Sequence, residues 1–171
     1  MHAVNDMVLY GRNGACKIVD ITKREVAGSS IEYYVLQPVY NQASTIFVPT
    51  GNQTLTGKMR QVLSADEIHA LIRSLPDEQS LWIEDEEERR ARYSEILSGG
   101  NRRDIVRMIK ALYLHREELK ERDKHLHLAD ERFLKDAERL LYDEFALVLQ
   151  IQPDQVLPFI LQQIEVAGKT E

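Results

Sequence analysis

The strongest constraint on the fold of this chain is a change in the spacing of its apolar residues at residues 51–63. Before this stretch, short segments rich in Val, Ile, Tyr, Phe and Thr are separated by turn-forming residues, which is typical of β-strands: VLYG, CKIVDI, EYYVLQPV and STIFVP. After it, apolar residues recur at helical spacing. A chain of 171 residues has room for two small domains. We therefore expect one domain at residues 1–58 and a second at residues 62–171.

The strand-rich part predicts four or five short antiparallel strands. Pro38 and Pro49 lack the N–H that a strand interior needs, so they favour strand ends or a sheet edge. This many short strands in so few residues is typical of a small barrel of the Tudor or SH3 type.

The second part predicts an all-α domain of about five helices, and the whole chain is therefore of the α+β class. Ser64 and Glu67 form a capping-box pattern for a helix that Pro76 ends. Further helices are expected at about residues 83–97, ended by Ser98-Gly99-Gly100, from about residue 101, and at about residues 130–150. In the last segment, Pro158 either kinks a helix or is its first residue.

Charge limits the partners that the chain can bind. The net charge is −6, and residues 61–171 carry more acidic than basic side chains. The broad basic field of many DNA-binding domains is absent, so any DNA contact must be local or assisted by another protein. No signal peptide and no membrane-spanning stretch is predicted, and the single cysteine, Cys16, fits a buried strand residue in a cytoplasmic protein.

The sequence lacks the common motifs of catalysis. It contains no P-loop, HExxH or GxSxG pattern. The pair His125 and His127 has no cysteine partner and is interpreted as part of a loop, and the consecutive acids of residues 84–88 point in different directions on a helix. We expect no enzyme activity, metal, cofactor or small-molecule substrate, and interpret the chain as a binding module.

Two features could carry binding. One is an exposed strand edge, which can pair with a strand of another protein. The other is Trp82, the only tryptophan, with Arg89, Arg90 and Arg92 after it. Trp82 either seals a junction between helices or touches a partner such as the DNA minor groove.

A second basic cluster follows at residues 102–110. Arg103, Arg107 and Lys110 share one helix face. This face is equally typical of solvated side chains paired with Asp104 or Glu117.

Several segments in order resemble the CarD family of bacterial transcription regulators. They are VLYGRNGACKIVDI, then Gly28 and IEYYVLQP, then a strand ending in Val48-Pro49, then Trp82, and finally RYSEILSGG, DIVRMIKALY and DAERLLYDEFALVL. The resemblance implies a Tudor-like domain that binds the β subunit of RNA polymerase through an edge strand. The residues that it implies for this contact are Arg24, Thr45, Ile46, Phe47, Val48 and Pro49. Some members have arginine where this chain has Phe47.

For the helical domain, the resemblance implies a contact with promoter DNA at the upstream edge of the open bubble. A tryptophan in the minor groove would help to hold the open complex, and the implied DNA-contacting residues are Trp82, Arg89, Arg90, Arg92, Arg103 and Arg107. The five acids after Trp82 depart from members with basic residues there, and like charge near phosphate should weaken binding. The alternative is a polymerase-docking module whose helical domain binds another protein and does not touch DNA.

Overall fold

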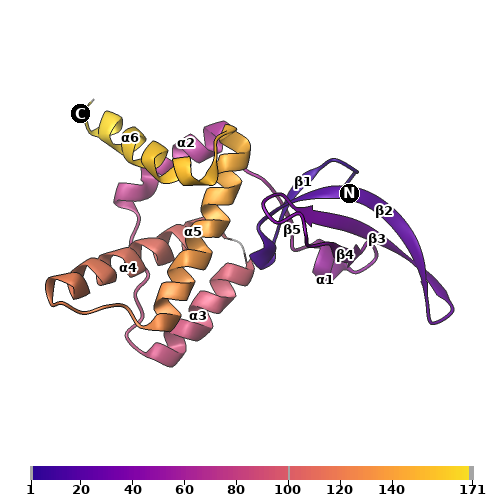
Figure 1. The fold of residues 1–171 in the computed structure, drawn as a ribbon, viewed down its shortest axis with the longest axis horizontal. Helices are drawn as coiled ribbons and strands as arrows, with labels where there is room; N and C mark the ends of the chain where they lie inside the picture. The colour runs from indigo at the N-terminus through magenta and orange to yellow at the C-terminus, as the bar shows by residue number, and fades with distance from the viewer. Residues whose placement is uncertain (1, 100, 170–171) are drawn as a thin grey trace. The chain divides into compact units, whose positions relative to one another are not determined.

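The computed structural model describes residues 2–99 and 101–169, with side chains through Gln163. The chain divides into two compact units, residues 1–62 and residues 63–171 (Figure 1). The first contains the β-strands and the second the long helices, and each unit is described by itself.

The N-terminal unit is an open antiparallel sheet of five strands in the order β4-β3-β2-β1-β5. The strands are β1 (Met7–Tyr10), β2 (Ala15–Val26), β3 (Ser29–Pro38), β4 (Ile46–Pro49) and β5 (Met59–Gln61), and a short helix, α1 (Gln53–Thr56), lies between the last two. The predicted strands are confirmed, but the predicted closure into a barrel is not. Closure would require β4 to pair with β5, and within the described residues these two short strands occupy opposite ends of the strand order.

The β2–β3 hairpin is the largest paired element of the sheet. Its strands pair from Cys16↔Pro38 to Val26↔Ser29, with an irregular register between Ile18 and Asp20. The two turn residues, Ala27 and Gly28, both have positive φ, which matches the twist of a two-residue hairpin. The hairpin is longer than the sequence predicts, because its mostly polar far end, from Lys23↔Glu32 to Val26↔Ser29, also pairs.

One face of the sheet forms the core of this unit. Ile18, Leu36 and Val48 are fully buried in it, together with Cys16. The expectation that Cys16 is a buried strand residue is therefore confirmed.

The helical unit contains five helices in its described residues, as predicted. They are α2 (Ala65–Ser74), α3 (Glu86–Gly99), α4 (Arg102–Glu121), α5 (Leu128–Leu149) and α6 (Val156–Lys169). The Ser64–Glu67 capping box is present at the start of α2. The Asn101 side chain accepts from the N–H of Asp104 and caps α4. Local side-chain caps therefore fix two of the helix starts.

Two helix boundaries differ from the sequence-based expectation. Helix α3 begins at Glu86 and not near residue 83, because Asp85 accepts the N–H of Glu88 as an N-cap. Pro158 is the third residue of α6, neither its first residue nor within its interior, and a first-turn nitrogen needs no helical partner. Gly100, expected as part of the stop after α3, lies outside the described residues.

Helix α5 provides the centre of the helical core. Its residues Ala137, Leu141 and Phe145 are buried and pack among residues of the other helices. It also carries two buried acids, Asp130 and Glu144, which are 3% and 1% exposed. Burial of a carboxylate is costly unless it is paired, and both acids bind arginines.

Candidate functional site

The first candidate site is the strand edge at β4. Strand β4 lies at one end of the strand order and pairs on one side with β3. Thr45 directly precedes it, and Ile46 through Pro49 form it. Val48 points into the core, while Phe47 lies on the opposite face and is 38% exposed. An edge strand leaves backbone groups for pairing with another chain.

Arg24 and Phe47 come together on the face of the sheet opposite its core. The guanidinium carbon of Arg24, on β2, lies 4.3 Å from the centre of the Phe47 ring. Tyr33, on the intervening strand β3, meets the Phe47 ring edge-on at 6.0 Å. Arg24 lies on β2, two strands away from the edge strand β4. Its side chain nevertheless places a positive charge beside Phe47. The two residues expected to act separately form one cation–π pair.

The second candidate site surrounds Trp82, in an irregular segment between the 3₁₀ turn at residues 75–77 and α3. The indole stacks on His115 of α4 with ring centres 4.0 Å apart. The guanidinium of Arg89 lies 4.5 Å from the indole centre, and the indole N–H donates to Glu84 at 3.1 Å. The side chain is partly buried and packs against the helical core. Trp82 therefore contributes to the junction between α3 and α4.

Arg89, expected at the DNA surface, is buried. It is 4% exposed, and its Nε and Nη2 donate to the two carboxylate oxygens of Asp130 on α5 at 3.0 and 2.9 Å. Its Nη1 donates to the carbonyl of Ile83 at 2.9 Å. Burial alone would lower its pKa, but the Asp130 carboxylate outweighs burial and raises it. Arg89 thus holds the Trp82 segment on α5, and its guanidinium is buried and does not lie at the surface.

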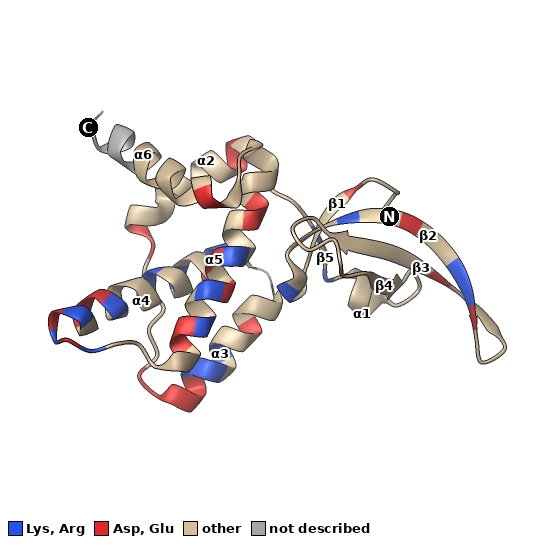
Figure 2. Ribbon diagram, viewed as in Figure 1, with Lys and Arg blue, Asp and Glu red and all other residues tan. Residues whose placement is uncertain are grey.

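Arg90 and Arg92 lie on the surface of α3. Their side chains are 53% and 41% exposed, and they pair with Glu86 at 2.7 Å and Glu95 at 3.4 Å. Arg92 also approaches Asp104 at 3.8 Å. The acids of residues 84–88 are all exposed, and the acidic start of α3 is visible in Figure 2. The surface around Trp82 is therefore of mixed charge.

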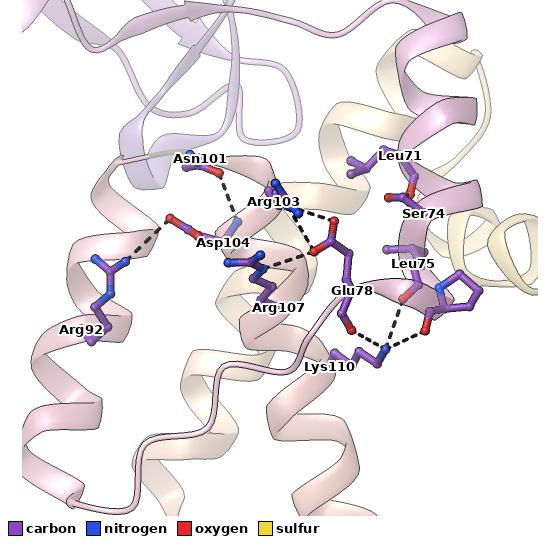
Figure 3. Close-up of polar contacts among 11 residues, drawn as sticks. Leu71, Ser74, Leu75, Glu78, Arg92, Asn101, Arg103, Asp104, Arg107 and Lys110 are labelled. Atoms are coloured by element: carbon purple, nitrogen blue, oxygen red, sulfur yellow. Dashed lines mark hydrogen bonds and ion pairs between the residues drawn. The ribbon is translucent and has the colours of Figure 1, made fainter.

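Arg103 and Arg107 of α4 both bind Glu78. Arg103 Nε donates to both carboxylate oxygens of Glu78, at 3.0 and 3.2 Å, and Arg107 Nε donates at 3.2 Å (Figure 3). The expected partners of this face were Asp104 and Glu117, but Asp104 approaches Arg92 and Glu117 pairs with Lys120. Burial would raise the pKa of Glu78, but the two arginines outweigh burial and lower it.

Lys110 completes the anchor of this segment on α4. Its ammonium donates to the carbonyls of Leu75, Pro76 and Glu78 at 3.3, 3.1 and 2.6 Å. Together with the bond from the Leu81 N–H to the Arg107 carbonyl at 3.1 Å, these contacts fix the chain that leads to Trp82.

The sequence analysis did not identify four residues that bind or stack on the arginines and the tryptophan of the helical unit. They are Glu78, His115, Asp130 and Glu144. Each acts through a partner far away in the sequence, and none stands in a recognisable motif. Among the described side chains, no three His, Cys, Asp or Glu residues gather in a way that could hold a metal ion. No helix within the described part of the chain is long and apolar enough to cross a membrane.

An open sheet with an edge strand is an arrangement that protein-interaction domains use to pair with a strand of another chain. Residues 3–63 match the family model of the CarD-like/TRCF RID domain. The N-terminal unit is therefore a domain of this family, and the CarD-like resemblance is confirmed for this segment. The match supports an interaction with RNA polymerase. A search of curated proteins found no match for this chain.

Proposed function

We propose that this protein is a transcription regulator that docks on the β subunit of RNA polymerase through the edge of β4. The observation that carries this proposal is the Arg24–Phe47 pair at the edge of a domain that matches the CarD-like/TRCF RID model. A polymerase strand would pair with the β4 backbone for affinity. The side chains of Thr45 and Phe47 and the charge of Arg24 would provide selectivity.

This proposal is tested with the full chain and purified polymerase β subunit. Arg24→Ala and Phe47→Ala should each weaken binding, since each removes one half of the pair. Lys23→Ala is the matched control, because Lys23 is the exposed neighbour of Arg24 and alternates to the other face of β2. Equal affinity of all three variants and the unchanged protein would contradict docking at β4.

We propose further that the helical unit contacts promoter DNA and stabilises the open complex. Trp82 would enter the minor groove at the bubble edge, with Arg90 and Arg92 of α3 beside it. A contact made only with opened DNA shifts the equilibrium toward that state. The partial exposure of the indole supports this assignment. To enter the groove, the ring must exchange its stacking on His115 and its bond to Glu84 for contacts with a base step.

The alternative is that the helical unit binds another protein and does not touch DNA. The contacts of the indole with His115, Arg89 and the core favour this alternative, as does the exposed acidic run beside it. The lifetime of promoter open complexes formed with Trp82→Ala separates the two functions. A shortened lifetime with unimpaired polymerase binding supports the DNA contact, and an unchanged lifetime supports the alternative.

A further inference from the structure

The helix face of Arg103, Arg107 and Lys110 carries more positive charge than its surroundings neutralise. Arg103 and Arg107 share one carboxylate, that of Glu78, while the ammonium of Lys110 donates to three backbone carbonyls. Arg103 remains 65% exposed in its side chain, and Arg107 is 30% exposed, whereas the Glu78 side chain is only 9% exposed. The two arginines therefore hold an internal anion while one of them stays open to solvent.

The geometry of this contact is that of an anion-binding site. Two guanidinium groups, spaced by one helical turn, converge on one carboxylate and bind it through Nε (Figure 3). The terminal NH₂ groups of both arginines take no part in these bonds. Guanidinium groups form charge-assisted N–H bonds with phosphate oxygens as well as with carboxylates. Glu78 thus occupies the position that a phosphate group would take.

From this arrangement we infer that Arg103 and Arg107 form a binding site for a DNA backbone phosphate, which the Glu78 carboxylate masks in the free protein. The inference rests on the proposed action of the helical unit on promoter DNA, and it adds the ligand group and its regulation. A phosphate can approach this site from the side of Arg103, whose side chain is 65% exposed. A weak internal anion can be displaced by the dense negative charge of a duplex.

Glu78 also connects the proposed phosphate site to Trp82. Glu78 is the first residue of the irregular segment that leads to the indole, and its own carbonyl accepts from Lys110. Displacement of its carboxylate frees one of the anchors that hold this segment on α4, while the Arg89 contacts with Ile83 and Glu84 remain. Phosphate binding and the release of Trp82 from its stacking would then favour one another. Free protein should accordingly bind DNA poorly.

The test compares DNA binding by Glu78→Gln and Glu117→Gln in the full chain. Both variants lose one negative charge, but Glu117 pairs with the exposed Lys120 and not with the proposed site. The probe is a fluorescein-labelled duplex with a central unpaired bubble, titrated at about 50 to 200 mM salt. The Glu78 variant should bind at least about threefold more tightly at low salt. Its salt slope should steepen by roughly 0.9 for each phosphate newly neutralised.

Further variants assign the gain to the two arginines. Adding Arg103→Ala to Glu78→Gln should remove it, whereas Arg103→Ala alone should change binding little. Glu78→Asp keeps the charge but is too short to bridge both arginines, so it provides the same test if the Gln variant lacks a thermal unfolding transition. Equal DNA affinity of the Glu78 and Glu117 variants would overturn the inference.

Two controls distinguish this inference from binding of free phosphate and from the proposed polymerase docking. If inorganic phosphate, at the phosphate concentration of the duplex, removes the gain, the site takes free phosphate and the DNA assignment is wrong. Polymerase binding by Glu78→Gln is measured in parallel and should be unchanged. The DNA titration needs no polymerase, so failure of β4 docking leaves its result intact, and failure of the titration leaves docking intact.

Discussion

Asp130 on α5 receives two hydrogen bonds from Arg89 on α3, across 41 residues of sequence, and both side chains are at most 5% exposed. This pair fixes the start of α3, because the same guanidinium also binds the carbonyls of Ile83 and Glu84. The position of Trp82 therefore depends on a buried charge on another helix.

Asp130→Asn should destabilise the protein strongly. It leaves the buried Arg89 charge without its counter-ion, and loss of one partner of a buried pair costs about 3–5 kcal/mol. Glu86→Gln, which removes the partner of the exposed Arg90, should cost less than about 1 kcal/mol. Urea unfolding of both variants measures the difference. Similar losses for the two would show that Arg89 has no special structural role.

Arg24→Ala should weaken polymerase binding without unfolding the protein. The guanidinium stacks on an exposed ring, so its loss should change the free energy of unfolding by only about 0.5–1 kcal/mol. At an interface, arginine and aromatic anchors commonly contribute more than about 1 kcal/mol. Titration calorimetry with the polymerase β subunit gives the affinity, and thermal unfolding gives the stability. A fall in stability that matches the fall in affinity would contradict a direct contact.

Trp82→Ala and His115→Ala together separate packing from DNA contact. Each removes one ring of the stacked pair. Trp82→Ala should lower the free energy of unfolding by about 2 kcal/mol, below the 3–5 kcal/mol typical of a fully buried aromatic ring. His115→Ala should cost less, and it leaves the indole in place. If Trp82 acts on DNA, only Trp82→Ala shortens open-complex lifetime, whereas equal shortening by both variants points to a packing effect.

The ion pairs of Glu78 should make stability depend on pH. The pKa of Glu78 is lower in the folded protein than its ordinary value of 4.5, because the hydrogen bonds from Arg103 and Arg107 outweigh the opposing effect of burial. The stabilisation is therefore present above the unfolded pKa and is lost as pH falls through the folded pKa. The difference in unfolding free energy between the unchanged protein and Glu78→Gln should be constant near neutral pH. It should shrink in acid, and a difference that does not change down to about pH 3 would contradict the pairing.

Sequence analysis succeeded where a structural signal is local. The Ser64–Glu67 capping box was predicted from residues three positions apart, and α4 begins at Arg102, where a helix from about residue 101 was expected. It failed where the partner is distant. Arg89 and Arg90 are neighbours in the sequence, but one lies on the buried side of α3 and the other in solvent. Arg89 lies on the same face of α3 as the buried Tyr93 and Ile96, and its partner there, Asp130 on α5, is 41 residues away in the sequence.

The same reason explains the remaining errors. Closure of the sheet depends on pairing between β4 and β5, which no short-range pattern encodes. The partner of Arg103 is Glu78, 25 residues earlier, and not an acid on the same helix. The candidate edge strand could be located from the sequence, but the contact between Arg24 and Phe47 requires the registers of three strands.

The N–H of Leu63, the first residue of the helical unit, donates to the buried Glu144 carboxylate at 2.9 Å. The same carboxylate binds Arg102 of α4 through two nitrogens. A mechanical pull on the chain from residue 62 would thus load the C-terminal part of α5 directly, before it could unwind α2. When the chain is pulled from this end, the Leu63–Glu144 hydrogen bond should therefore break first.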